Sequence, residues 1–311
     1  MSLPYFRRSL HARRDWSGGL VKRALTASKY VFRCALHWRH QSAWLRFLHE
    51  TPRMSAMLPH DSRLHERPLH AYINRLLPLA RRYAIIESHY RYLLAHWPAH
   101  LIDRVYREGA ASLGRLVLKN DSVAELQLRR PLGRGREGEL ALYLLDAEGR
   151  PLSSVIFTLA DEGRTVLIGC LQGAAAGLGR EAVREFTKQA HGLRPKNLLL
   201  SMLYALAQAI GASQMLGVGN RAHPFSRNKG KIKADYDGFW AECLAQPRPD
   251  GFHALPLHEP ARDESLVESK HRSAFRKREA LRHTACSLLV QAVNGTRQDA
   301  ANTEYGPSVA A

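Results

Sequence analysis

The stretch that decides the fold is residues 197–220, NLLLSMLYALAQAIGASQMLGVGN, which carries no charge although charged residues make up 24% of the chain. Gly211 divides it into a helical part, residues 195–210, and a strand-like part, residues 214–218. A membrane-spanning helix needs about 20 uninterrupted apolar residues, and glycines and polar residues interrupt this run. The sequence therefore predicts a core helix that leads into a core strand, in a soluble protein.

Both ends of this unit are basic. HGLRPKN (191–197) precedes it and GNRAHPFSRNKGKIK (219–233) follows it. Pro195 suits the first turn of a helix, where its missing N–H costs nothing. Arg194 and Lys196 flank that helix N-terminus, whose free N–H groups and positive dipole end favour an anion. We therefore predict an anion site there. The basic residues expected to extend anion binding into the following loop are Arg221, Lys229 and Lys231.

The composition indicates a globular protein with an anionic partner. The 311 residues include 46 Lys plus Arg against 28 Asp plus Glu, a net charge of +18. Such an excess points to nucleic acid, phosphorylated lipid or an acidic membrane surface, and charge alone does not choose among them. The four cysteines show no CxxC spacing, so neither a zinc site nor a dense disulfide framework is indicated, and a reducing compartment fits best.

The N-terminal region has two interpretations. Its arginines are not followed by an apolar stretch of signal-peptide length, so a cytoplasmic location is expected. Residues 20–49 mix large apolar side chains with basic ones at helical spacing. Such a helix rests on an anionic bilayer surface in some proteins and packs on its own domain in others. The second interpretation is favoured, because Trp and Arg are also common where helices of a soluble protein meet.

We divide the chain into a basic helical N-terminal extension (1–60), a main domain (61–293) and a disordered tail (294–311). Within the main domain, residues 61–113 are expected to be helical, with one amphipathic helix over 76–93 that Pro78 kinks. The helix ends before Pro98, and that proline begins the next one.

The period of the apolar residues changes to two after Gly114. The segments LVLKN, AELQLRR, ELALYLLD, PLSSVIFTLA and TVLIGCLQG are separated by turn sequences, which predicts an antiparallel meander. Helices and strands then alternate, and a helix over 265–293 is expected to place Arg282 on its basic surface. Residues 114–293 are thus a mixed sheet core, and the fold class is α+β.

Five blocks of the sequence resemble a known family. They are HYRYL (89–93), FTKQAHGLRPKNLLLSMLYALAQAIGA (186–212), GVGNRAHP (217–224), KIKADYDGFWAEC (231–243) and ESKHRSAFRKREALR (268–282). Together they resemble the VirK/YbjX family of Gram-negative bacteria over roughly residues 60–292. The resemblance implies a part in envelope integrity, virulence and resistance to antimicrobial peptides. It names a context and leaves the reaction open.

The order of elements also resembles the acyl-CoA N-acyltransferase (GNAT-like) fold. That resemblance implies a donor pyrophosphate at the N-terminus of the helix from Pro195. It also implies an acyl transfer in the gap between the strand that ends at Gln172-Gly173 and the strand 214–218. The implied cofactor is acyl-CoA or an acyl carrier protein thioester. Two departures are the missing Gln/Arg-x-x-Gly-x-Gly/Ala loop before Pro195 and an extra helix at 180–190. The residues expected to bind the cofactor are Gln172, Gly173, Arg194, Lys196 and Asn197.

A transferase of this kind needs an acid or base near the ends of the core strands. His223 is the first candidate, because a loop histidine after a buried strand titrates near neutral pH. Asp235 and Tyr236 are the next candidates, as acid and base or as groups that orient an amine. In the competing interpretation His223 only terminates the strand, and Asp235 pairs with a neighbouring lysine.

The basic helix near the C-terminus also has two interpretations. Lys270, Arg272 and Arg276 either hold phosphates of a lipid, cofactor or nucleic acid, or form a solvated helix face. Only Phe275 interrupts the polar stretch with an aromatic ring, and no helix-turn-helix pattern is present. Nucleic acid is therefore the less favoured partner, after anionic lipid or a membrane surface.

The leading functional hypothesis is a cytoplasmic protein, peripheral to the inner membrane, that transfers an acyl group to an envelope amine or hydroxyl. The alternative is a non-catalytic binding module for anionic lipid or nucleic acid. An enzyme needs a cleft that joins residues 194–197 with His223 or Asp235, whereas a binder needs only an open positive face. No motif indicates a metal site or a particular partner protein.

Overall fold

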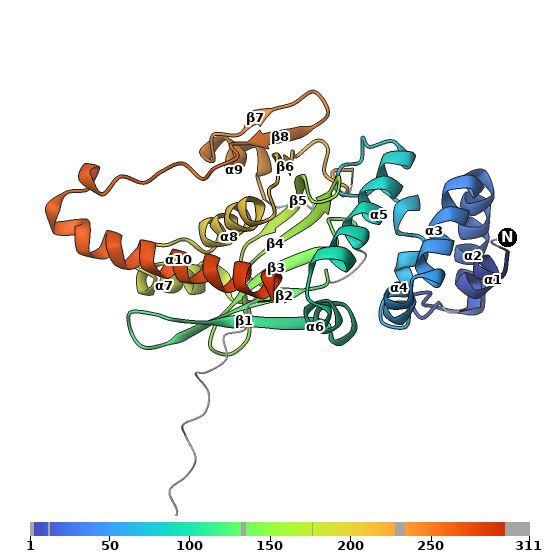
Figure 1. The fold of residues 1–311 in the computed structure, drawn as a ribbon, viewed down its shortest axis with the longest axis horizontal. Helices are drawn as coiled ribbons and strands as arrows, with labels where there is room; N and C mark the ends of the chain where they lie inside the picture. The colour runs from blue at the N-terminus through green and yellow to red at the C-terminus, as the bar shows by residue number, and fades with distance from the viewer. Residues whose placement is uncertain (1–2, 12, 132–134, 176, 228–233, 296–311) are drawn as a thin grey trace, which may run out of the picture.

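The computed structural model describes residues 3–11, 13–131, 135–175, 177–227 and 234–295. Helices α1 to α4 lie next to one another at one end of the molecule (Figure 1). Their bounds are α1 Leu3–His11, α2 Leu20–Leu36, α3 Trp38–Glu50 and α4 Pro52–Met57. Residues 1–2 and 12, and the predicted tail from residue 296 onward, lie outside the described residues.

The N-terminal helices share a core with the rest of the chain. Trp44 of α3 is fully buried, and its ring lies 6.5 Å from that of Tyr90. Gln41, also fully buried, accepts a hydrogen bond from the Tyr83 hydroxyl at 2.6 Å and donates one to the His65 carbonyl at 2.7 Å. These contacts satisfy polar groups that would otherwise be buried without partners, so they hold α3 firmly against α5.

An eight-stranded sheet forms the centre, in the order β1-β2-β3-β4-β5-β6-β8-β7. Strands β1 to β5 pair antiparallel with their sequence neighbours, β6 runs parallel to β5, and β8 pairs antiparallel with β6. The predicted meander and the α+β class are therefore confirmed. The bounds are β1 Ala110–Val117, β2 Val123–Arg129, β3 Leu140–Leu145, β4 Pro151–Ala160, β5 Thr165–Gln172, β6 Gln214–Val218, β7 Gln246–Pro247 and β8 Phe252–Leu255.

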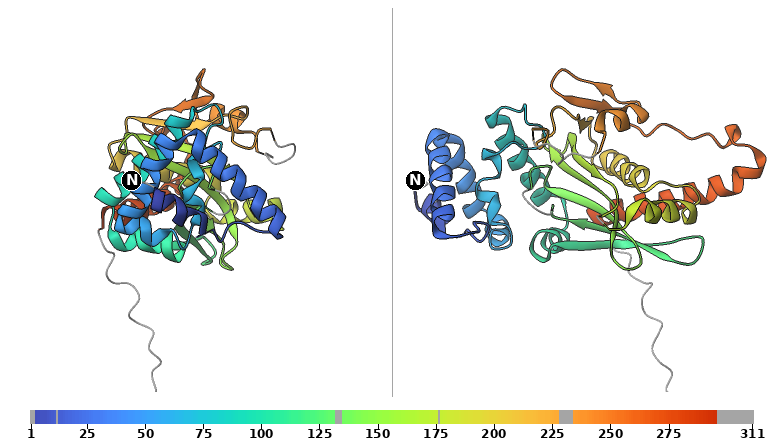
Figure 2. Two further views of the ribbon diagram at one scale, coloured as in Figure 1. Left: turned by 90° about the vertical axis from the view of Figure 1, so that its right-hand side faces the viewer. Right: turned by 180° about the vertical axis from the view of Figure 1, so that it is seen from behind.

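Helices cover the sheet on both faces. On one face α5 (Leu79–His96) lies against β4, and on the other α8 (Pro195–Ala209) lies against β3, β4 and β5 (Figure 1). All of β4 after its first residue is buried, as expected for a strand covered on both sides. Helix α10 (Arg272–Asn294) packs on α8 and β1, and Figure 2 shows α7 and α8 beside it.

The remaining elements are helix α7, two shorter helices and several single helical turns. They are α6 Ala99–Asp103, α7 Gly179–Gln189, α9 Tyr236–Glu242, a π-helical turn at Arg104–Glu108 and 3-10 turns at Ser62–His65, Arg67–Leu69, Glu264–Leu266 and Ser269–His271. Within the described residues, no helix has both the length and the apolar character that a bilayer crossing requires.

Two prolines and one glycine bear on where three of the elements begin. Pro98 precedes α6 as predicted, but Pro78 does not kink a helix: it is the N-cap of α5, which begins at Leu79. Proline is better tolerated at a helix start than in its interior. Strand β1 begins at Ala110, earlier than the change of period after Gly114 predicts. Gly114 lies at a bulge, which breaks the alternation of apolar residues and hides the first part of the strand in the sequence.

Arg282 is not on the surface of the C-terminal helix as predicted. It is 6% exposed and donates hydrogen bonds to Ser201 on α8 and to Glu279 on its own helix. A buried guanidinium requires such partners, and sequence spacing does not reveal them. The helix itself begins at Arg272, later than the predicted Ser265.

Candidate functional site

A tight turn sets the start of α8. His191 and Gly192, at φ 56° and 88°, both adopt the left-handed conformation, and the Gly192 N–H donates to the Thr187 carbonyl at 2.7 Å. Since glycine adopts this conformation without cost, the pair can reverse the chain directly after α7. The N-terminus of α8 therefore lies beside the last turns of α7.

A recess of about 540 Å³ opens at this point. Four of the five residues predicted to bind a cofactor line it: Gly173, Arg194, Lys196 and Asn197; Gln172 does not. The other residues that line the recess are Leu152, Ser153, Val183, Arg184, Thr187, Lys188, Gly192, Pro195, Phe239 and Glu242. Its walls thus combine an apolar part with basic side chains at the helix N-terminus.

The positive charge in this recess is partly uncompensated. Arg184 and Lys188 lie within ion-pair distance of Glu181 and Glu185 on their own helix, whereas neither Arg194 nor Lys196 has an ion-pair partner among the described residues. The ammonium group of Lys196 lies 5.7 Å from the centre of the Phe239 ring. Residue Arg194 is the N-cap of α8, and no side chain caps the helix. An anion would therefore find free N–H groups as well as cations here.

A second candidate lies where β5 and β6 separate. Gly169 is an extra residue in β5, because Ile156 pairs with Cys170 and Phe157 pairs with Ile168. A Cβ atom at Gly169 would come within 1.9 Å of the carbonyl oxygen of Glu137. The bulge thus lets the segment that contains Glu137 lie directly on the strand.

Four polar side chains meet beside this bulge. The Cys170 thiol lies 3.2 Å from the Tyr236 hydroxyl, and the rings of Tyr236 and His223 stack with their centres 5.2 Å apart. His223 Nε2 lies 3.2 Å from Glu137 Oε1. Burial raises the pKa of Cys170 and of Tyr236 well above their usual ranges. Both are therefore neutral at physiological pH.

The contacts of the two ring nitrogens of His223 show which of them carries the proton in the neutral ring. Nδ1 accepts a hydrogen bond from the Phe225 N–H at 3.2 Å, so in the neutral ring the proton is on Nε2, toward Glu137. That contact is close enough for an ion pair but too poorly aligned for a hydrogen bond, and we regard it as an electrostatic contact.

The donor set of Glu137, Cys170 and His223 could in principle hold a metal, since the three ligand atoms lie within 4.8 Å of one another. These are donor types that zinc accepts. However, a neutral histidine that binds through Nε2 carries its proton on Nδ1, where an acceptor should lie. Here Nδ1 faces the N–H of Phe225. The residues fit a hydrogen-bonded polar cluster better than a metal site.

Helix α9 stands between the two candidates. Its Phe239 lines the recess, and its Tyr236, one turn earlier, belongs to the buried cluster. His223 is 2% exposed and does not line the recess. Among the described residues, the structure therefore brings Arg194 and Lys196 together and brings His223 and Tyr236 together, and only the first pair lines the recess.

Asp235 has a structural contact of its own. Its carboxylate accepts hydrogen bonds from the Gly238 N–H at 3.1 Å and from the Asn220 amide at 2.8 Å, so it caps α9. These hydrogen bonds, that of Asn220 first, lower the pKa of Asp235. The side-chain oxygen Oδ1 of Asn220 in turn accepts from the Tyr236 N–H at 2.8 Å. Asp235 thereby helps to place Tyr236 against the cluster.

The remaining predicted anion-binding residues lie apart from the recess. Lys270 and Arg276 form ion pairs with Glu268 and Glu264, and Arg272 donates to a backbone carbonyl at 3.0 Å. Arg221 is exposed in the loop after β6. Lys229 and Lys231 lie outside the described residues.

Sequence reasoning missed Glu137 and Cys170. Glu137 lies in the segment 133–138, whose glycines and arginines are typical of a turn. Cys170 lies within an apolar strand. Only the glycine inside that strand, Gly169, was a signal, because an isolated glycine in a strand pattern indicates a bulge or a close backbone approach.

Comparison with known proteins places these features in a family. The model of the family described as "Protein of unknown function (DUF535)" matches residues 20–286. The chain is 28% identical over 257 residues to the protein YbjX of Escherichia coli (strain K12), a match that covers 80% of this chain and 78% of that one. A match of 23% identity to "Membrane protein LapB" of Mannheimia haemolytica covers 61% of this chain and 81% of that protein.

A Haemophilus influenzae protein is 29% identical over 143 residues, covering 45% of this chain and 48% of its own length. The family match begins at residue 20, so it includes α2 to α4 together with the sheet. It covers both candidate sites. The chain thus belongs to the DUF535 family, and the resemblance to the VirK/YbjX family is confirmed.

Proposed function

We propose that this protein binds an acyl thioester, as acyl-CoA or on acyl carrier protein, in the recess at the N-terminus of α8, and transfers the acyl group to an amine or hydroxyl. The observation that carries the proposal is the position of Arg194 and Lys196, without acidic partners, at a helix N-terminus beside an apolar wall. A phosphate suits the cations and N–H groups, and an acyl or pantetheine arm suits the wall formed by Leu152, Val183 and Phe239.

The topology supports this placement. β5 and β6 run parallel and are connected through α7 and α8. Gly173, directly after β5, and Arg194, at the N-terminus of α8, line the same recess, so this helix end lies near the C-terminal end of β5. Ligands of sheets with parallel strands commonly bind outside the carboxyl ends of those strands. A volume of about 540 Å³ is typical of a small-molecule site.

In the proposed transfer the acceptor nitrogen or oxygen attacks the thioester carbonyl carbon, the new bond to carbon forms, and the C–S bond breaks. The leaving thiolate then takes up a proton. Burial raises the pKa of Tyr236, so its phenol is protonated. It would pass this proton to the sulfur as the C–S bond breaks. The Glu137 carboxylate, which lies 3.2 Å from Nε2 of His223, would accept the proton that the acceptor loses. Tyr236 would take up that proton in turn, so that no tyrosinate remains. The acyl arm must reach past α9 for this to occur.

The envelope role implied by the VirK/YbjX resemblance is part of the same proposal. The acceptor would be an envelope lipid, peptide or protein, and the protein would act at the cytoplasmic face of the inner membrane. The name of one relative, "Membrane protein LapB", supports a membrane context, as does the net charge of +18, since cytoplasmic leaflets are negatively charged.

A non-catalytic binding module is the second candidate. It is favoured by one observation: His223 is buried and does not line the recess. Such a module would use the same cations to hold an anionic lipid or nucleic acid without any transfer.

The test is a calorimetric titration of the full-length protein with a long-chain acyl-CoA. Arg194→Ala should weaken binding about tenfold, as expected for loss of one charge-assisted contact. Arg276→Ala removes the same charge from an exposed, paired position on α10 and is the matched control. If the native protein does not bind acyl-CoA, or if both variants lose affinity equally, the proposed site is wrong.

Transfer is tested separately. With acyl-CoA and an envelope extract as acceptor, Tyr236→Phe should lower the rate of thiol release and leave acyl-CoA affinity unchanged. Binding without thiol release in the native protein would support the binding module instead.

A further inference from the structure

Helix α2 has an exposed apolar stripe, which we define as Val21, Leu25, Phe32 and Leu36. Their exposed fractions are 76%, 57%, 69% and 66%. At 100° per residue these four positions fall within an arc of about 60° on the helix. A row of large apolar side chains exposed to water is uncommon on a soluble protein and marks an interaction surface.

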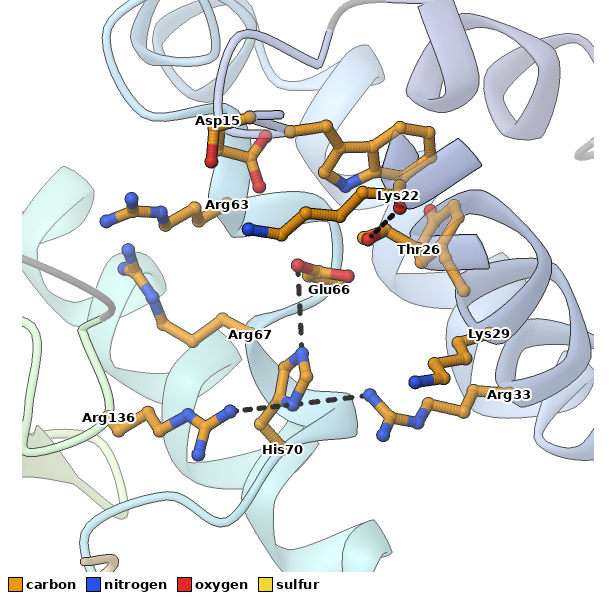
Figure 3. Close-up of a pocket in the computed structure, with 13 residues that line it drawn as sticks. Asp15, Lys22, Thr26, Lys29, Arg33, Arg63, Glu66, Arg67, His70 and Arg136 are labelled. Carbon is orange, nitrogen blue, oxygen red and sulfur yellow. Dashed lines mark hydrogen bonds and ion pairs between the residues drawn. The ribbon is translucent and has the colours of Figure 1, made fainter. Parts of the chain in front are cut away.

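Beside this stripe on the same helix is a row of cations. The row consists of Lys22, Lys29 and Arg33, which lie about 60° further around the helix axis than the stripe. These three residues line a recess of about 460 Å³ (Figure 3). The opposite wall of this cationic recess comes from the rest of the chain and carries Arg63, Arg67, His70 and Arg136. Stripe and recess therefore occupy adjoining parts of one surface.

The recess has far more positive than negative charge. Six of its residues are Lys or Arg, and one of them, Arg67, is paired with Asp61 and Glu139. The two acids that line the recess, Asp15 and Glu66, each already form an ion pair with Arg13. Lys22, Lys29 and Arg33 have no ion-pair partner among the described residues. An anion that entered would meet several cations whose charge the protein leaves uncompensated.

Two guanidinium groups that line the recess converge on a single neutral atom. Arg33 Nη1 lies 3.3 Å and Arg136 Nη2 lies 3.1 Å from Nδ1 of His70, as Figure 3 shows. Burial lowers the pKa of His70, and this outweighs the opposing effect of Glu66, so the ring is neutral at pH 7. Two guanidinium groups brought to one imidazole nitrogen are arranged as they would be around one anionic oxygen.

We propose that α2 lies in the surface of a bilayer, with its apolar stripe among the acyl chains and the cationic recess around the phosphate of an anionic phospholipid. An interfacial helix of this kind buries its apolar face by about 5–10 Å. The apolar stripe alone would fit many partners, but the adjoining cations select an anionic surface. A nucleic acid would leave the stripe in water, and a second copy of this chain would bring two rows of cations together.

The test is sedimentation of the full-length protein with vesicles. Phosphatidylcholine vesicles that contain phosphatidylglycerol should bind it, and pure phosphatidylcholine vesicles should not. The variant Lys22→Glu/Lys29→Glu should lose at least about tenfold in affinity, because each basic residue near such a surface contributes substantially. Arg276→Glu/Lys277→Glu, with the same charge change on exposed positions of α10, is the control and should lose much less.

A second variant separates the bilayer from free phosphate. Leu25→Ser/Phe32→Ser alters only exposed side chains, so the fold should be kept, as circular dichroism can check. It should lose about tenfold in vesicle affinity and keep its affinity for soluble glycerol phosphate. Unchanged vesicle binding by this variant, equal losses in the recess and control variants, or no vesicle binding by the native protein would each overturn the proposal.

Discussion

Arg67 and Glu139, 72 positions apart in the sequence, form an ion pair that is almost completely buried. The Tyr90 hydroxyl donates to the same carboxylate oxygen at 2.5 Å, and Asp61 is the second acidic partner of Arg67. Burial raises the pKa of Glu139, although Arg67 opposes that effect. The pair joins the helical N-terminal part to the start of β3, and its guanidinium lines the cationic recess.

Glu139→Ala should lower the free energy of unfolding by about 3–5 kcal/mol, because removal of one partner leaves the other charge buried without full compensation. Urea denaturation followed by circular dichroism measures this. Glu148→Ala, which removes an exposed ion pair with Arg150, is the control and should cost less than about 1 kcal/mol. Similar losses in both variants would contradict the structural role of Glu139.

The stability of the protein should fall on mild acidification because of His89. Its Nδ1 accepts from the Leu159 N–H at 3.1 Å, and its Nε2 lies 2.9 Å from the Tyr106 hydroxyl. Burial first, and then Arg67, lowers its pKa to about 3. The unfolded chain takes up this proton near pH 6.5 and the folded one does not. The stabilisation is thus complete above pH 6.5 and is lost as the pH falls toward 3.

At pH 5 this one group should remove up to about 2 kcal/mol relative to pH 7. His65, whose pKa burial lowers to about 4, acts in the same direction. Urea midpoints at the two pH values measure the loss, and His89→Gln should flatten it. A variant that loses as much stability as the native protein between pH 7 and 5 would show that His89 is not the cause.

Gly169→Ala should destabilise the protein by about 1–3 kcal/mol or more, since the new methyl group would overlap the Glu137 carbonyl and force the backbone apart. Gly173→Ala is the control, because no atom lies within 4 Å of a Cβ at that position. Thermal unfolding of both variants gives the comparison. An unchanged midpoint for Gly169→Ala would mean that residues 136–139 do not lie on β5 as described.

The central unit could be predicted from the sequence because its signals are local. The uncharged run, Pro195 and Gly211 predict α8 and β6 almost to the residue, since proline suits a helix start and glycine, here at φ 67°, suits a helix end. The predicted cluster at the α8 N-terminus follows from the same logic, because neighbouring residues at one helix end remain neighbours in space.

Contacts between distant segments could not be predicted in this way. Glu137, Cys170 and His223 meet only because a bulge at Gly169 lets a loop lie on the strand, and a single sequence does not show which loop. Arg282 looks like a surface residue until its contacts with Ser201 and Glu279 are known. The cationic recess likewise combines α2 with residues around position 65 and Arg136.

The apolar stripe of α2 also bears on how the purified protein behaves in solution. At low ionic strength the net charge of +18 keeps molecules apart by mutual repulsion. Added salt shortens the range of that repulsion while leaving the attraction between exposed leucine and phenylalanine side chains in place. Concentrated stocks should consequently remain monodisperse in dilute buffer and begin to self-associate as sodium chloride rises, a trend that detergent micelles should reverse.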